Sequence, residues 1–490
     1  MSASRISAVS LGLASALTLT TAQATNGYMS HAYSPAAKGM AGAGEATLAQ
    51  DSLSIVGNPA TLAKLGQRLD LAAALFSPSR EYRGITPDAA TGAYAPIGSG
   101  NGTGTVKSKN QNFLIPSFGY THPLDAKSTV GLALFGNGGM NTDYRSGNSM
   151  LNLGTYGGNN GCANPPHGPG NPCGAQVPGT SLLGGGNTGV NLSQLGIALG
   201  YARRVMDNLS LGASFLVGYQ TIEIRGVGGF QGFTQTFTQS MIANGGRSAS
   251  SPVNLTDRGT DSAWGYGLQL GALWDITPQW TLGLSLRSKT YMSKFKKYSD
   301  LLAEGGDLDV PAAGTIGLAF KPNNRLTLAL DVQQIWYSDV PAIGNTNQLA
   351  QRCDVNAAFG PTASGSSYNP SYCLGGRNGA GFGWRDMTVL KLGVQYLVTD
   401  ALTLRAGYSH GNQIIRRQEI AFNTLTPAVI QDHWTLGATY RLRKQYEVSF
   451  WGMYAPEKRV SGPGAFTGTQ SASISMSQYE LGLSFGWLIN

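Results

Sequence analysis

Residues 479–489 alternate large apolar side chains with small or polar ones. The large set is Tyr479, Leu481, Leu483, Phe485, Trp487 and Ile489, and the set between them is Glu480, Gly482, Ser484 and Gly486. Because successive side chains of a β-strand point to opposite faces, this pattern predicts a strand with one apolar face and one face that tolerates water. The same alternation returns along most of the chain. It is typical of a transmembrane β-barrel, whose outer face contacts lipid and whose inner face lines a lumen.

A barrel strand that crosses the membrane needs roughly 9–11 residues. The alternating segments that reach or approach this length are 68–83, 109–122, 128–144, 191–206, 208–226, 260–276, 279–297, 311–321, 325–339, 385–399, 401–417, 430–443, 445–459 and 473–489. There are fourteen of them, and an even number is typical of single-chain bacterial barrels. The sequence therefore predicts an all-β fold, a fourteen-stranded antiparallel transmembrane barrel over residues 67–490.

The connections between these segments alternate in length. Short turns such as Asp207–Asn208 contrast with long loops at 145–190, 227–259 and 340–384. Barrels of this class place short turns in the periplasm and long loops outside the cell. Aromatic side chains on the outward phase flank the short turns, as expected for rings at the level of lipid headgroups. They are Tyr120, Tyr201, Trp274, Trp280, Phe320, Tyr396, Tyr440 and Tyr446. The inward phase predicts a narrow, polar lumen.

The first residues resemble an export signal. Arg5 supplies a positive charge, residues 6–19 are apolar or small, and Ala22-Gln23-Ala24 forms a small-x-small cleavage site. We therefore expect residues 1–24 to be a signal peptide and the mature protein to begin at Thr25. No later stretch approaches 18 consecutive apolar residues, so spanning helices are excluded. The expected location is the outer membrane of a Gram-negative bacterium.

Four cysteines fall into two local pairs. Cys162 and Cys173 bracket one loop rich in Pro, Gly and Asn, and Cys353 and Cys373 bracket another. In an oxidising compartment this arrangement predicts two loop disulfides, with local pairing favoured among the three possible connectivities. No C-x-x-C motif or histidine pair suggests a metal site. The net charge of +8 is modest for this length and gives no support to nucleic-acid binding.

Residues 25–66 do not alternate; they contain short helical patches separated by glycines. A segment of this length ahead of a closed barrel predicts a plug, or hatch, inside the lumen. Its motifs resemble the hatch of FadL-type outer-membrane transporters of hydrophobic compounds. The hatch and gating positions that carry the resemblance are Gly39, Gly42, Gly44, Asp51, Asn58, Pro59 and Ala60. Further matches include the runs Gly136–Tyr144, Asp261–Gly267 and Gly383–Asp386.

The resemblance implies a barrel that takes up long-chain fatty acids or other hydrophobic small molecules. It also implies that the third strand is kinked and that ligand leaves sideways into the lipid. The kink candidates are Gly136, Asn137, Gly138 and Gly139. Glycines tolerate departures from regular pairing, which suits a kink. A simple bulge at the barrel rim is the alternative interpretation of these residues.

Ligand contacts are predicted at two places. Lys391 and Arg405 lie on the inward phase and are candidates for binding a carboxylate, since such a ligand needs a cationic anchor. The alternative is a lumenal charge ladder with acidic residues of the barrel and hatch. An apolar cluster in the first long loop is a candidate landing groove. It comprises Met150, Leu151, Leu153, Tyr156, Leu182 and Leu183.

Three functions remain open from the sequence. The first is passive uptake of long-chain fatty acids, the second is uptake of aromatic or aliphatic hydrocarbons, and the third is a structural or adhesive barrel. No nucleotide-binding or catalytic motif occurs, so we expect neither an enzyme nor a cofactor. The expected partners are the hydrophobic ligand, outer-membrane lipid and the barrel assembly machinery during biogenesis. The barrel is expected to be a monomer.

Overall fold

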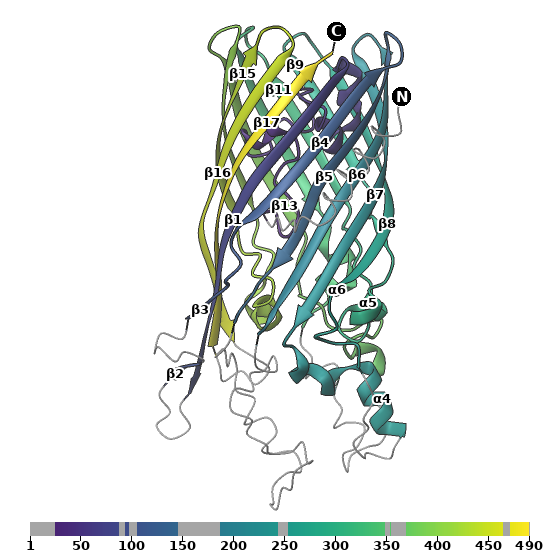
Figure 1. Ribbon diagram of the computed structural model, residues 1–490, viewed down its shortest axis with the longest axis vertical. Coiled ribbons are helices and arrows are strands. Elements are labelled where there is room, and N and C mark those ends of the chain that lie inside the picture. Colours follow the sequence, from purple (N-terminus) through teal and green to yellow (C-terminus); the bar gives the residue numbers. More distant parts are fainter. Residues whose placement is uncertain are drawn as a thin grey trace, which may run out of the picture.

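A closed, antiparallel barrel forms the body of the protein (Figure 1). The computed structural model describes residues 25–87, 94–97, 105–145, 187–243, 253–347, 353, 369–463 and 471–489. The sheet closes because β1 pairs with both the next wall strand and the last one; Leu75 lies opposite Leu481 of the last strand. Within the described residues, no helix is both long enough and apolar enough to cross a membrane.

Fourteen long strands make the wall. They are β1 (Arg68–Pro87), β4 (Phe113–Pro123), β5 (Ser128–Asn141), β6 (Gly189–Met206), β7 (Leu209–Arg225), β8 (Asp261–Asp275), β9 (Trp280–Arg287), β11 (Ala313–Phe320), β12 (Leu326–Ile335), β13 (Met387–Leu397), β14 (Leu402–Gly411), β15 (Asp432–Leu442), β16 (Tyr446–Pro463) and β17 (Ser471–Leu488). Three short strands extend the sheet: β2 (Tyr94–Ile97), β3 (Thr105–Lys107) and β10 (Tyr291–Met292). Each predicted segment overlaps one wall strand, so the predicted fourteen-stranded barrel is confirmed.

The predicted strand at 279–297 is interrupted in the structure. The segment 279–297 was expected to be continuous, but β9 ends at Arg287 and pairing resumes only in β10. At the break, the side-chain Oγ of Ser288 accepts the backbone N–H of Leu268 at 2.9 Å. A side chain there takes the place of a backbone acceptor, which alternation of apolar residues does not reveal.

The helical segments are short. In chain order they are α2 (Pro35–Lys38), α3 (Ser54–Gly57), η1 (Pro59–Lys64), η3 (Gly228–Phe233), α4 (Gln235–Ala243), η4 (Lys296–Tyr298), α5 (Ala303–Gly306), η5 (Tyr337–Asp339), α6 (Pro341–Gly344), η6 (Pro370–Tyr372), η7 (Arg417–Glu419) and α9 (Ile420–Asn423). The first three belong to the hatch, residues 25–66. The others lie in the connections at the end of the barrel opposite the short turns (Figure 1).

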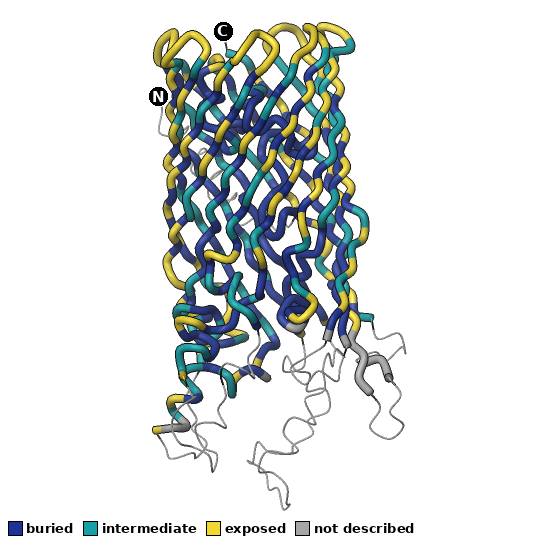
Figure 2. The backbone as a smooth tube through the Cα atoms, turned by 180° about the vertical axis from the view of Figure 1, so that it is seen from behind, coloured by how far each residue is buried: buried dark blue, intermediate teal, exposed yellow. Residues whose placement is uncertain are grey.

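The two faces of the wall differ as the alternation predicts. Buried and exposed residues alternate along the strands (Figure 2). On β17, Leu481 is 66% exposed whereas Glu480 is 1% exposed, because one faces lipid and the other the lumen. The eight predicted girdle aromatics are all exposed or half-buried beside short turns. We assign the short-turn end to the periplasm.

The hatch lies inside the barrel, as predicted, and nearly all of its residues are buried (Figures 1 and 2). Two of its short helices, α2 and η1, begin at side-chain caps followed by proline, whereas α3 has no side-chain cap. Ser34 Oγ accepts the N–H of Ala37 at 3.3 Å, and Asn58 Oδ1 accepts the N–H of Ala60 at 3.0 Å. Such caps let a single helical turn form where propensity alone would not sustain it.

The outer half of the lumen is apolar, which differs from the prediction of a polar lumen. Large buried side chains from strands and loops fill it, including Tyr28, Phe76, Tyr82, Phe113, Tyr337, Trp384 and Met476. The inward phase becomes apolar only toward the outer strand ends, and the loops add further apolar side chains.

One predicted disulfide is present. Cys353 and Cys373 are bonded, with their Cα atoms 4.7 Å apart. Leu374, the next residue, donates its N–H to Phe233 O at 2.9 Å, so the disulfide-bonded loop is joined to the loop that carries α4. Cys162 and Cys173 lie outside the described residues, and their pairing stays a prediction.

Candidate functional site

The predicted hatch glycines Gly42 and Gly44 adopt left-handed backbone conformations. Gly42 has φ +85° and Gly44 has φ +83°, a region that side chains other than glycine rarely enter. A Cβ atom on Gly42 would lie 2.4 Å from His31 O. Gly39 follows the last residue of α2 and packs against Gly437 of β15. A Cβ atom on Gly39 would lie 3.0 Å from the Cα atom of Gly437. The predicted glycines therefore shape tight turns that fit against the wall.

An aspartate of the wall binds one of these turns. Asp331 on β12 accepts the N–H of Gly44 through Oδ1 at 3.1 Å and the N–H of Ala46 through Oδ2 at 3.0 Å. Both side-chain oxygens are thus used by hatch backbone. Hydrogen bonds to a charged group inside a protein are stronger than neutral ones, so this aspartate fixes the position of the turn.

Lys391 on β13 lies opposite Asp331 in the wall and also binds the hatch. Its Nζ donates to His31 O at 3.0 Å and lies 3.7 Å from Glu45 Oε2. Glu45 Oε1 in turn accepts the N–H of Tyr33 at 2.6 Å. Lys391, a predicted carboxylate-binding residue, is therefore in contact with hatch groups. This arrangement agrees with the alternative interpretation, a ladder of lumenal charges shared by barrel and hatch.

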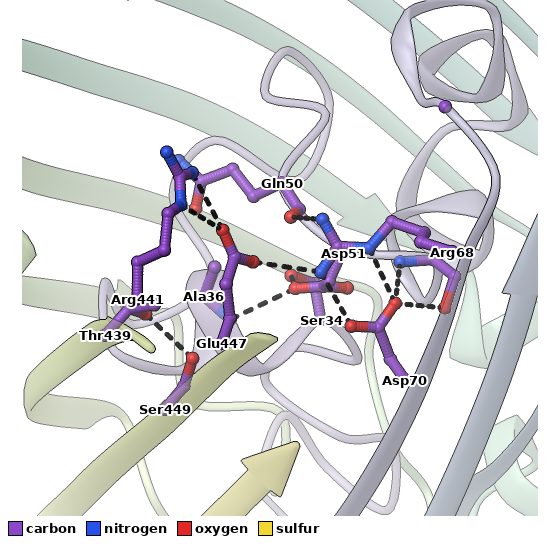
Figure 3. A network of polar contacts seen from close by, with 12 residues as sticks. Ser34, Ala36, Gln50, Asp51, Arg68, Asp70, Thr439, Arg441, Glu447 and Ser449 are labelled. Carbon is purple, nitrogen blue, oxygen red and sulfur yellow. Dashed lines mark hydrogen bonds and ion pairs between the residues drawn. The ribbon is translucent and has the colours of Figure 1, made fainter. Parts of the chain in front are cut away.

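Asp51 joins separate parts of the hatch (Figure 3). Its Oδ2 accepts from Ser34 Oγ at 2.5 Å and from the N–H of Ala36 at 3.3 Å, and its Oδ1 accepts the N–H of Leu53 at 3.0 Å. Burial, together with the nearby carboxylate of Asp70, raises the pKa of Asp51 to about 6. The hydrogen bonds that the carboxyl group of Asp51 accepts lower its pKa, but the loss of hydration on burial raises it by more.

A second acidic group anchors the hatch to β1. Asp70 Oδ2 accepts both the N–H and the Oγ–H of Ser52, at 2.8 and 2.5 Å. Arg68 pairs with Asp70 at 2.7 Å and with Glu447 of β16 at 3.2 Å, while Nη1 donates to Gln50 O at 2.8 Å (Figure 3). This ion-pair network ties the periplasmic end of the hatch to two wall strands.

The Asn-Pro-Ala motif sits against two glycines of the wall. Asn58 Nδ2 donates to Ala272 O on β8 at 3.0 Å. A Cβ atom on Gly271 would lie 2.0 Å from Asn58 Oδ1, and one on Gly212 of β7 would lie 2.5 Å from the backbone N of Ala60. Only glycines let the wall approach this closely. Pro59 supplies the fixed φ of the first helical position, so the motif positions η1.

A polar cavity of about 680 Å³ lies between the hatch and the periplasmic end of the barrel, and we call it the vestibule. Arg405 lines it, donating from Nε to Gln395 Oε1 at 2.8 Å and from Nη1 to Thr439 Oγ1 at 2.6 Å. Gln395 on β13 is the cross-strand partner of Arg405, and Lys391 lies on the same strand as Gln395, four residues before it. The structure does not bring Lys391 and Arg405 together at one ligand site.

The third wall strand has an irregularity at the predicted kink. Along β5 and β6, the register shifts between Gly136 and Gly138, so Asn137 is an extra residue. The start of the hatch fits there: Gly139 N donates to Tyr28 O at 2.9 Å, and a Cβ on Gly138 would lie 1.9 Å from that oxygen. The bulge therefore faces the hatch from within the wall.

Just before the bulge, β4 and β5 separate. Their pairing runs from Pro123–Thr129 only as far as Phe118–Leu134. The outer part of β4 keeps only its pairing with β1, and the outer part of β5 keeps only its pairing with β6. Among the described residues, backbone bonding across this side resumes at Lys109 N to Asp143 O, at 2.9 Å. We call the interval between 113–117 of β4 and 135–141 of β5 the wall gap.

Some residues near the site were not singled out from the sequence. Tyr28, Tyr337 and Trp384 form a buried aromatic cluster in the outer lumen, with ring centroids 5.2 to 5.8 Å apart. Trp384 comes from a loop without periodicity. The only sequence feature that pointed to it was the run Gly383–Asp386, which resembles the transporter family. The predicted landing-groove residues, Met150 to Leu183, lie outside the described residues and stay a prediction.

Comparison with known proteins agrees with this geometry. A family profile described as outer membrane protein transport protein (OMPP1/FadL/TodX) matches residues 16–158 and 179–462. The barrel is similar to the Pseudomonas putida toluene transporter TodX, with 18% identity, a TM-score of 0.60 and coverage of 94% of this chain and 99% of that one. A Pseudomonas aeruginosa FadL homologue gives 15% identity, a TM-score of 0.61 and coverage of 95% and 100%.

The Ralstonia pickettii toluene transporter TbuX gives 18% identity, a TM-score of 0.56 and coverage of 94% and 99%. No curated protein sequence matches the chain significantly. At these identities the solved structures support the fold, while the family profile covers most of the chain. The chain therefore belongs to the outer membrane protein transport protein (OMPP1/FadL/TodX) family, outer-membrane barrels that transport hydrophobic compounds.

Proposed function

We propose that this protein takes up hydrophobic molecules passively and releases them sideways through the wall gap into the outer membrane. The observation that carries the proposal is the separation of β4 from β5 beside the bulge at Asn137. A molecule that leaves there enters hydrocarbon directly. It avoids the aqueous part of the barrel, where water excludes apolar surface.

The division of the lumen supports the sideways route. The outer half is apolar, whereas the vestibule beneath the hatch is polar and lined by charged groups such as Arg68, Asp70 and Arg405. A hydrophobic solute gains nothing from entering such a cavity. The hatch lies between the apolar outer half and the vestibule. Asp331 holds its middle and Asp70 holds its periplasmic end, so it stays in place between them.

Long-chain fatty acids are the proposed substrates, with aromatic or aliphatic hydrocarbons as the second candidate. The second candidate is favoured by one observation: Lys391 and Arg405 already bind protein groups and offer no free anchor toward the apolar half. In the same proposal, residues 1–24 direct export, and the barrel assembly machinery inserts the monomer in the outer membrane.

Deletion of Asn137 tests the route. Removing the extra residue restores regular pairing between β5 and β6, so we expect the barrel to fold while uptake of labelled oleate and toluene into proteoliposomes falls at least tenfold. The matched control is deletion of Pro456, which lies in a β16 register shift away from the gap, between Ala455 and Lys458. Folding is checked by heat-modifiable gel mobility. Undiminished uptake by a folded ΔAsn137 barrel contradicts the route.

Growth assays separate the two substrate classes. A deletion strain with and without this gene is compared on oleate and on toluene as carbon sources. Growth restored on oleate selects fatty acids, and growth restored only on toluene selects hydrocarbons. Restoration on neither, with no binding of either labelled compound to purified protein, overturns the transport proposal.

A further inference from the structure

A buried arginine on β1 lies beside the wall gap. Arg80 points into the lumen on the same face as Phe76 and Tyr82 and is only 2% exposed. Its cross-strand neighbour on β17 is Met476, which is also buried. A charged side chain in these apolar surroundings is costly unless its donors are satisfied.

Its donors are only partly satisfied. Nη1 donates to the backbone oxygen of Asn141, the last residue of β5, but Nε and Nη2 are buried without a hydrogen-bond partner. No carboxylate of the described residues lies within ion-pair distance of Arg80. The acidic residue that follows on the β5 side, Asp143, is already paired with Arg145 Nε at 2.8 Å. A buried cation is thus left without an anion.

The two unpartnered nitrogens have a specific geometry. Nε and Nη2 share one edge of the guanidinium, and a carboxylate binds such an edge through two parallel hydrogen bonds. Arg287, which is also buried near the hatch, has one such nitrogen, Nε, without a partner, whereas both donors of the edge are unpartnered in Arg80. Other buried basic residues near the hatch already have acceptors for their cationic groups. For example, Lys38 pairs with Glu480 at 2.7 Å, and Arg68 pairs with Asp70 at 2.7 Å.

Arg80 also connects the two sides of the wall gap. Its guanidinium carbon lies 5.7 Å from the ring centroid of Phe113 on β4, while Nη1 binds Asn141 on β5. A cavity of about 20 Å³ lies beside it, lined in part by Phe76, Met140 and Met476. Such a volume holds about one water-sized group, which is less than a whole carboxylate, so binding through two oxygens requires the lining of the cavity to move.

The remaining wall of this cavity comes from an outer connection. Residues 426–428, between α9 and β15, line the cavity opposite the strands. The connection is held to β5 and its extension by Thr142 Oγ1 donating to Leu425 O at 2.8 Å and by Tyr144 OH donating to Thr424 O at 2.9 Å. These two hydrogen bonds are the contacts that a ligand tail would displace on reaching Arg80.

We propose that Arg80 is an anion anchor at the wall gap, which binds the carboxylate of an amphipathic substrate while its apolar tail passes between β4 and β5. The inference rests on the proposed function and adds a selectivity for carboxylates over neutral molecules of the same length. Its ligand class is an unbranched or aromatic carboxylic acid with an extended apolar body.

The test uses the full-length barrel in detergent and two probes of equal chain length, oleate and oleyl alcohol. Wild-type protein should bind oleate more tightly than the alcohol. Arg80→Gln should weaken oleate binding about 10- to 100-fold, the loss expected for a charge-assisted pair, and leave the alcohol unchanged. Arg80→Lys, which keeps the charge but not the two-donor edge, should give an intermediate loss.

Arg83→Gln is the matched control, because this arginine lies on the same strand but is exposed on the opposite face. It should bind both probes as the wild type does. Equal loss of both probes in Arg80→Gln, or unchanged oleate binding, overturns the anchor. So does a wild type without preference for oleate, whatever the folding of the variants. Failure of the wild type to bind either probe or toluene contradicts the proposed function instead.

Discussion

Asp331 and Lys391 are cross-strand partners of opposite charge on β12 and β13, and both bind the hatch. The aspartate accepts two backbone N–H groups of the turn at residues 44–46, and the lysine donates to the backbone oxygen of His31. The pair therefore holds the hatch at two separate points. This arrangement makes the hatch a part of the wall's hydrogen-bond network rather than a loose plug.

Asp331→Ala should loosen the hatch without unfolding the barrel. The change removes both charge-assisted acceptors, each worth about 1.5–3 kcal/mol, and leaves two buried N–H groups without partners. Amide exchange at residues 44–46 should accelerate, and conductance in planar bilayers should rise. Asp207→Ala, in an exposed short turn, is the control and should change neither. Unaltered exchange in Asp331→Ala would show that the aspartate does not hold the turn.

Gly271→Ala should displace the Asn-Pro-Ala motif. The added methyl group would lie 2.0 Å from Asn58 Oδ1, a separation that requires the hatch or the strand to move. Overpacking of this kind costs about 1–3 kcal/mol, which should appear as a lower melting temperature and faster amide exchange in η1. At Gly452 the nearest atom would be 3.4 Å away, so Gly452→Ala is the control and should be tolerated. Equal effects of the two substitutions would contradict the close fit.

Hatch stability should fall as pH rises from about 4 to 6. The pKa of Asp51 is raised from 3.8 to about 6, so in this interval the folded state binds more protons than the unfolded state. The stability contribution is therefore fully present below pH 4, decreases through the interval and is level above it. The free energy of opening at residues 51–57, from amide exchange corrected for intrinsic rates, measures the slope. Asp51→Asn should flatten it, and an unchanged slope would exclude Asp51 as the cause.

Removal of the outer disulfide should affect the loops and leave the barrel unchanged. Cys353→Ser frees a connection that Leu374 N holds to Phe233 O at 2.9 Å. We expect faster proteolysis in residues 369–376 and 228–243 and no change in the melting temperature of the barrel, which is stabilised by its closed hydrogen-bond ladder. Reduction of the wild type should reproduce the effect. A fall in the barrel's melting temperature would mean that these loops support the wall.

The alternating pattern of side chains was sufficient to predict the wall of the barrel. In a barrel each residue faces either lipid or lumen, so the period of two in segments such as 479–489 specifies both the strand and the face of each residue. Gly136 to Gly139 marked the place where pairing becomes irregular, and the non-alternating segment 25–66 marked the hatch. These are local properties of the chain, and a local pattern is sufficient to predict them.

The contacts between polar groups could be seen only in the folded barrel. Lys391 and Arg405 look equivalent on the inward phase, yet one lies under the hatch at Glu45 and the other in the vestibule at Thr439. Arg80 showed no special feature in the sequence and is distinguished only by two donors that no neighbour accepts. Charge pairing depends on distances between residues far apart in the chain, and these distances are set by closure of the barrel around the hatch.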